Sequence, residues 1–138
     1  MTVTDLHVLL SYRDAAAAID WLERALGFGT TMRYDTEDGV VGHAELRRDA
    51  AVIVVFDDAG AGYDHPRPRG EGCGTGTYLT VAEAAGVDAL WTSALAAGAV
   101  PVWEPGWTPW GNYRCRVLDP EGREWTAGIH RPGEEYAG

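Results

Sequence analysis

Apolar residues near the start of the chain recur at the spacing of an amphipathic helix. Asp14 is a favourable N-cap and Gly27 a favourable C-cap, so the pattern predicts a helix over residues 14–26. Shorter apolar runs predict a strand before it, over residues 3–10, and three strands after it, over residues 28–34, 40–47 and 51–56. Asp38 and Gly39 form a hairpin signal between the first two of these three strands.

The second half of the chain repeats this order. Residues 57–76 are rich in Gly and Pro and are expected to form a long mobile connection. A strand over residues 77–81 and a helix over 87–97, ended by Gly98, then precede strands over 100–103, 113–118 and 123–129. A proline–glycine turn at Asp119–Gly122 joins the last two strands. The repeat, about 70 residues long, predicts an α+β fold of two βαβββ modules (1–57 and 77–138, linker 58–76) with curved mixed sheets around a cavity.

The predicted strands alternate between an apolar and a polar face. The apolar face consists of Ala44, Leu46, Ile53, Val55, Cys115, Val117, Trp125, Ala127 and Ile129. The alternate positions carry His43, Glu45, Arg47, Arg114, Arg116, Glu124, Thr126 and His130. Such a face either meets solvent or, in a curled sheet, lines a cavity.

Composition narrows the possible partners. The net charge of −10 repels phosphate backbones, so no nucleic-acid partner is expected. It favours cationic ligands, although solubility alone also explains it. No apolar run approaches the roughly 20 residues of a membrane span, and no secretory signal is visible, so a cytoplasmic location without membrane contact is expected. Cys73 and Cys115 lie far apart and are expected to be reduced.

Motifs at both ends of the chain resemble the vicinal oxygen chelate superfamily of glyoxalases and bleomycin-resistance proteins. The opening motifs are His7-Val8-Leu9-Leu10, Arg13-Asp14, Ile19-Asp20-Trp21-Leu22 and Ala25-Leu26-Gly27-Phe28. The closing motifs are Thr108-Pro109-Trp110-Gly111, Arg114 and Asp119-Pro120-Glu121-Gly122-Arg123-Glu124-Trp125. Their order and spacing span nearly the whole chain. The resemblance implies a small-molecule cavity and a homodimer in which modules of two chains build the cavities.

The resemblance also locates the metal ligands of the superfamily's metal-dependent members. The four positions carry His7, Val54, Gly76 and Thr126 in this chain. Valine and glycine have no ligating side chain and threonine is a poor ligand, so we expect no catalytic metal and no cofactor. His7 is then expected to be a cavity or core histidine. A metal held by His7 with His43 and Glu45 is an alternative that the superfamily does not use.

Aromatic residues and possible proton-transfer groups supply the remaining candidates. The chain has 6 Trp and 6 Tyr against 2 Phe, and the tryptophans crowd one segment. We expect Trp107 and Trp110 at the rim of a pocket, whereas Trp103 and Tyr113 also suit a core. His43, Glu45 and Glu124 have the chemistry of a general acid or base. The predicted ligand-binding residues are His43, Glu45, Tyr78, Trp103, Trp107, Trp110, Arg114 and Arg116.

These observations favour a non-catalytic protein that binds a small molecule, planar or cationic, with antibiotics as one candidate class. The alternative is a lyase, isomerase or dioxygenase-type enzyme acting on a small oxygenated substrate. A binding module for an unrelated metabolite is a third interpretation.

Overall fold

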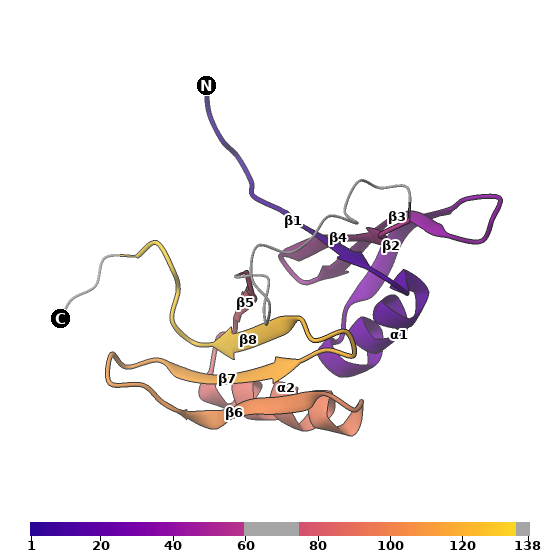
Figure 1. Cartoon of the computed structure of the whole chain (residues 1–138). Helices are drawn as coiled ribbons and strands as arrows, with labels where there is room; N and C mark the ends of the chain where they lie inside the picture. The colour runs from indigo at the N-terminus through magenta and orange to yellow at the C-terminus, as the bar shows by residue number, and fades with distance from the viewer. Residues whose placement is uncertain (60–74, 135–138) are drawn as a thin grey trace. The chain divides into compact units, whose positions relative to one another are not determined.

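The computed structural model describes residues 1–59 and 75–134. The chain divides into two compact units, Met1–Gly74 and Thr75–Gly138, and each is described by itself. Each unit contains one helix and one four-stranded mixed sheet (Figure 1). The α+β class and the two βαβββ modules are therefore confirmed. The expected mobile connection falls largely on residues 60–74, which lie outside the described part of the chain.

The first unit is built from β1 (Val8–Tyr12), α1 (Ala15–Leu26), β2 (Gly29–Asp35), β3 (Val41–Arg48) and β4 (Ala51–Asp57). The strand order in the sheet is β1-β4-β3-β2. Strand β1 is parallel to β4, and the other pairs are antiparallel, with β2 and β3 joined by the predicted hairpin.

The second unit repeats this arrangement with β5 (Thr77–Thr80), α2 (Ala84–Ala96), β6 (Val100–Trp107), β7 (Tyr113–Leu118) and β8 (Glu124–Gly128). Its strand order, β5-β8-β7-β6, is the order of the first sheet with each strand replaced by its counterpart. Strand β5 is parallel to β8, as β1 is to β4. The repeat predicted from the sequence is therefore a repeat of topology.

The helix ends show why these residues form the predicted elements. The Asp14 side chain accepts a hydrogen bond of 3.0 Å from the backbone N–H of Ala17, as an N-cap residue does. Gly27 and Gly98 follow the two helices with φ angles of 72° and 88°, a conformation that favours glycine. Arg48 donates a hydrogen bond of 2.6 Å to the carbonyl of Leu26 and so satisfies the C-terminus of α1.

Three boundaries differ appreciably from the predictions. Strand β1 begins at Val8, five residues later than expected, and ends at Tyr12. Helix α2 begins three residues earlier than expected, at Ala84, because Gly86 is accommodated within its first turn. Strand β6 continues to Trp107, beyond the expected end at Trp103. It is an edge strand, so its prolines remove no hydrogen bonds between central strands of the sheet. Its register with β7 shifts around Pro101 and Trp103. None of the helices in the described residues is long and apolar enough to cross a membrane.

The predicted face alternation holds in both sheets. The apolar positions of β3, β4, β7 and β8 are buried, whereas His43, Glu45, Arg114 and Arg116 are only partly buried. In the second unit the Sγ atom of Cys115 lies 3.9 Å from the carbonyl oxygen of Val87 in α2. The apolar face is therefore the one covered by the helix, and the partly exposed residues lie on the opposite face.

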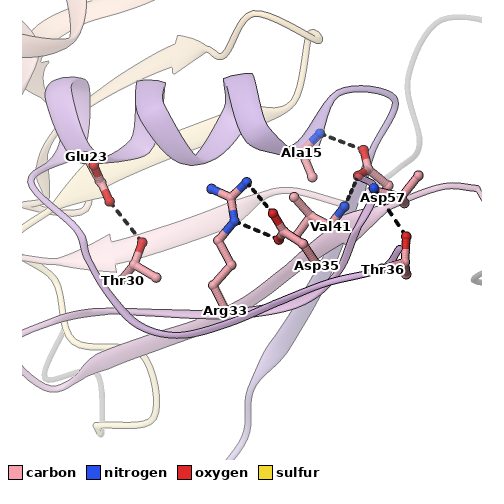
Figure 2. Close-up of polar contacts among 9 residues, drawn as sticks. Ala15, Glu23, Thr30, Arg33, Asp35, Thr36, Val41 and Asp57 are labelled. Atoms are coloured by element: carbon pink, nitrogen blue, oxygen red, sulfur yellow. Dashed lines mark hydrogen bonds and ion pairs between the residues drawn. The ribbon is translucent and has the colours of Figure 1, made fainter. Parts of the chain in front are cut away.

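Asp57 links the helix to the sheet in the first unit. One carboxylate oxygen accepts a hydrogen bond of 2.9 Å from the N–H of Ala15, and the other accepts one of 2.6 Å from the N–H of Val41. Figure 2 shows the carboxylate between these two groups. The same view shows Arg33 joined to Asp35, and Glu23 joined to Thr30. Asp57 thus fixes the start of α1 against the start of β3.

Candidate ligand-binding site

Strand β7 positions the two arginines of the candidate site. Arg114 and Arg116 flank Cys115, whose side chain faces α2, so both arginines project from the opposite face of the sheet. Trp103 lies directly across from Arg116 on β6. The guanidinium carbons of Arg114 and Arg116 lie 3.7 Å and 3.9 Å from the centre of the Trp103 ring. Both distances are within the range of a cation–π interaction. We call these three residues the arginine–tryptophan stack.

The two arginines differ in what surrounds them. The Nε atom of Arg116 donates a hydrogen bond of 2.8 Å to the hydroxyl of Thr126. Its Nη1 atom lies 3.5 Å from the carboxylate of Glu124, so part of its charge is balanced. The Nε and Nη1 atoms of Arg114 are buried and have no hydrogen-bond partner among the described residues. Arg114 is therefore the less compensated cation of the stack.

Three exposed indoles lie on β6 and in the turn after it. Trp103, Trp107 and Trp110 are 39%, 66% and 53% exposed, so the alternative of a core position for Trp103 is wrong. The ring of Trp110 lies 5.8 Å from the guanidinium carbon of Arg114. The ring of Trp107 packs at 5.2 Å, in a tilted geometry, against Tyr113, which is partly buried. These exposed rings offer flat apolar surface with a polar edge.

Tyr113 and Tyr78 use their hydroxyl groups within the chain. Tyr113 donates a hydrogen bond of 2.6 Å to Asp88 of α2, and this bond raises the pKa of its phenol. Tyr78 donates to the carbonyl of His130 at 2.7 Å and accepts from the amide of Asn112 at 3.3 Å. Burial is the main cause of the raised pKa of Tyr78. The Tyr78 hydroxyl therefore serves the fold, and only its ring remains for a ligand.

Asn112 is a structural residue of this face that the sequence analysis missed. It is 4% exposed, and its side-chain oxygen accepts hydrogen bonds of 3.0 Å from the N–H groups of Ile129 and His130. Gly128 makes room for it, because a Cβ there would lie 2.8 Å from that oxygen and 2.5 Å from the Tyr78 hydroxyl. A glycine near the end of the predicted last strand was the available signal.

His43 and Glu45 lie in the first unit, on the sheet face opposite α1. The Nε2 atom of His43 is 2.7 Å from a carboxylate oxygen of Glu45. The two side chains are 41% and 43% exposed. The structure thus pairs these two predicted residues with each other. Tyr78, Trp103, Arg114 and Arg116 lie on one face of the other sheet. The predicted Trp107 does not join them, because it pairs with Tyr113, which bonds to Asp88 of α2, and so lies on the helix side.

The donor set at the expected metal positions does not fit a metal site. Val54 and Gly76 provide no ligating side-chain atom. The hydroxyl oxygen of Thr126 is hydrogen-bonded to the guanidinium of Arg116, a positive charge that disfavours a divalent cation beside it. His7 is exposed, 3.3 Å from the carbonyl oxygen of Val52, so it is not a core histidine. Within residues 1–59 and 75–134, no three His, Cys, Asp or Glu side chains are grouped to hold a metal.

The fold and this site define a two-module α+β protein with a cationic and aromatic sheet face. A model of the Glyoxalase/Bleomycin resistance protein/Dioxygenase superfamily matches residues 6–126, so the chain belongs to this superfamily. No curated protein matches the chain.

Solved structures of several relatives share the fold. TioX from Micromonospora sp. ML1 is 29% identical, with a TM-score of 0.73 over 94% of this chain and 100% of its own. Lactoylglutathione lyase from Agrobacterium tumefaciens is 22% identical, with a TM-score of 0.64 over 93% and 94% of the two chains. The fosfomycin resistance protein FosX from Listeria monocytogenes, in complex with Mn(II) and 1S,2S-dihydroxypropylphosphonic acid, is 10% identical, with a TM-score of 0.70 over 95% and 94%.

Proposed function

We propose that this chain is a non-catalytic protein that binds a planar small molecule, with antibiotics as one candidate class. The observation that carries the proposal is the exposure of Trp103 and Trp110 beside the two arginines of one sheet face. Monomeric proteins seldom leave several large aromatic rings exposed together without a binding partner. Planar ligands stack on such rings, and the donor set gives no support to a metal reaction.

The site of the proposal is the helix-free face of the second sheet. Trp110 forms its edge, and the ring of Tyr78 and the arginine–tryptophan stack form its floor. A homodimer and a cytoplasmic location are part of the same proposal. His43 and Glu45 of the first unit stay proposed ligand-binding residues of their own sheet face. The expectation of a cationic ligand rests on the net charge of the whole chain, −10.

The substitution Trp110→Ala tests the site. Calorimetric titrations with planar aromatic antibiotics, bleomycin among them, should show saturable binding to the unchanged chain. One aromatic stack contributes roughly 0.5–1.5 kcal/mol, so the variant should bind roughly 2- to 12-fold more weakly. Its melting temperature should stay nearly unchanged, because the ring is exposed. Trp91→Ala is the control, since Trp91 belongs to α2, which covers the other face of the sheet.

Two results would refute this assignment. One is a Trp110→Ala variant that loses stability but keeps full affinity, which would make Trp110 a structural residue. The other is a complete absence of saturable binding across the panel.

The second candidate function is catalysis, and the His43–Glu45 pair favours it. A histidine within 2.7 Å of a carboxylate, with both side chains accessible, has the geometry of a general acid–base pair. Methylglyoxal–thiol adducts and catechols are the substrates to assay. Turnover that is abolished by His43→Gln and unaffected by Asp49→Asn, a change in the β3–β4 turn, would replace the binding proposal with a lyase, isomerase or dioxygenase-type activity.

A further inference from the structure

We infer that the ligand of this sheet face is a planar aromatic molecule carrying a negatively charged group, of the chemical class of an aromatic carboxylate. The inference rests on the proposed function and names the ligand's charge. It differs from the expectation of a cationic ligand, which rests on the negative net charge of the whole chain. The charged groups beside the aromatic rings are two arginines, which are positive. Electrostatic recognition follows the local groups when these are partly desolvated.

The first argument is the charge inventory of the face. Arg114 and Arg116 are two cations on alternate positions of one strand. Glu124 lies 3.5 Å from Arg116 and balances one of them in part. Asp88, the carboxylate bonded to Tyr113, belongs to α2 on the other side of the sheet. No ion pair involving Arg114 occurs among the described residues. The two arginines and Glu124 together therefore carry a net positive charge, although the chain is acidic.

The second argument is the hydrogen-bonding state of Arg114. Its Nε and Nη1 atoms have left water without gaining an acceptor in the described chain. The Trp103 ring, 3.7 Å from the guanidinium carbon, stabilises the cation through its π face but accepts no conventional hydrogen bond from it. Buried donors without acceptors destabilise a protein, and an anion is the strongest acceptor for a guanidinium. A ligand carboxylate beside the Arg114 guanidinium would thus supply an acceptor that the described residues do not provide.

The third argument places the aromatic part of the ligand. Trp110 is 53% exposed, and its ring centre is 5.8 Å from the guanidinium carbon of Arg114. An aromatic ring stacked on Trp110 would hold a directly attached carboxylate near Arg114. One molecule could therefore use the exposed indole and the uncompensated cation together, which a neutral or cationic ring could not.

Three probes of nearly equal shape isolate the charge. The full-length protein is titrated calorimetrically with 2-naphthoate, 2-naphthamide and 2-naphthylmethylammonium. We expect 2-naphthoate to bind about tenfold more tightly than 2-naphthamide, because one charge-assisted hydrogen bond typically changes the affinity by about this factor. The ammonium compound should bind most weakly, because the arginines repel it.

Substitutions at Arg114 assign this preference to one residue. In Arg114→Gln the affinity for 2-naphthoate should fall to that for 2-naphthamide, whose own affinity should remain. Arg114→Lys should retain most of the preference, because the charge is kept. Arg24→Gln changes the net charge equally at an exposed pair on α1 and should have no effect. Circular dichroism and melting curves confirm that each variant is folded.

The possible failures can be told apart. Equal affinity for the acid and the amide, or tightest binding of the ammonium compound, would overturn the charge inference while leaving the binding function intact. A preference that survives in Arg114→Gln would overturn the assignment to Arg114. Absence of binding by all three probes and by the antibiotic panel would overturn both proposals.

Discussion

Trp103 and Arg116 face each other across strands β6 and β7, and the guanidinium carbon lies 3.9 Å from the centre of the indole ring. Arg114, two residues earlier on β7, contacts the same ring. The indole and the two arginines therefore hold one another in place on an accessible face. A site whose walls are fixed in this way loses less entropy when a ligand binds.

The Asp57 link predicts a specific loss of stability. Asp57→Ala removes the acceptor of two backbone N–H groups, those of Ala15 and Val41. We expect the free energy of unfolding, measured by urea titration, to fall by about 2 kcal/mol. Asp20→Ala removes only an exposed ion pair with Arg24 and should change it by less than about 0.5 kcal/mol. Equal effects of the two substitutions would show that the link contributes little.

Gly128 and Gly76 make a matched pair for packing on the second sheet. A Cβ at Gly128 would meet the Tyr78 hydroxyl at 2.5 Å, and Gly128→Ala should lower the unfolding free energy by about 1–3 kcal/mol. The nearest atom to a Cβ at Gly76 would be a carboxylate oxygen of Glu124 at 3.3 Å, the far end of a flexible side chain, so Gly76→Ala should cost less than about 1 kcal/mol. If both variants unfold at the same urea concentration, the close packing of Tyr78 and Asn112 on Gly128 does not contribute to the stability of the fold.

Cys115 is predicted to be slow to react. Burial is the main cause of its raised pKa, so the folded thiol carries less thiolate at pH 8 than an exposed cysteine does. In a Cys73→Ser background, iodoacetamide should alkylate the folded chain at least about tenfold more slowly than the chain in urea. The unfolded thiol ionises at lower pH than the folded one. The stability that this group contributes is therefore fully present below its ordinary pKa and is lost as the pH rises from there through the raised pKa of the folded thiol. Equal alkylation rates would contradict this burial.

Metal removal should leave the protein unchanged. Chelator treatment is expected to leave the melting temperature the same, because Val54 and Gly76 give a divalent ion no side-chain ligand and Arg116 places a cation at Thr126. Elemental analysis should find no stoichiometric metal. About one zinc, nickel, iron or manganese per chain, lost together with thermal stability on chelation, would contradict the prediction.

Local signals in the sequence were sufficient to predict most of the architecture. Asp14 and Gly27 marked the ends of the first helix because capping is decided by neighbouring residues. Asp119 accepts hydrogen bonds from the N–H groups of Glu121 and Arg123, so the predicted turn is also a local structure. The repeat then predicted the same order of elements along both halves of the chain, whereas the order of the strands within each sheet comes from the structure.

The site was less predictable because it depends on contacts between strands. Alternation placed Arg114 and Arg116 on one face, yet their contact with Trp103 depends on the β6–β7 register. That register shifts at Trp103, which no local pattern reveals. The role of Asn112 likewise depends on residues 129 and 130, which reach it only in the folded sheet. Periodicity therefore indicated the face but not its interactions.

The most direct test of the binding site is a titration followed through the six tryptophan indole N–H resonances in a ¹H–¹⁵N correlation spectrum. With 2-naphthamide as the probe, we expect saturable shifts of the indole resonances of Trp103 and Trp110. The resonances of Trp21 and Trp125, 2% exposed in the core, should stay in place. Shifts confined to Trp91 on α2, or no saturable shift at any indole, would contradict a planar-ligand site on the helix-free face of the second sheet.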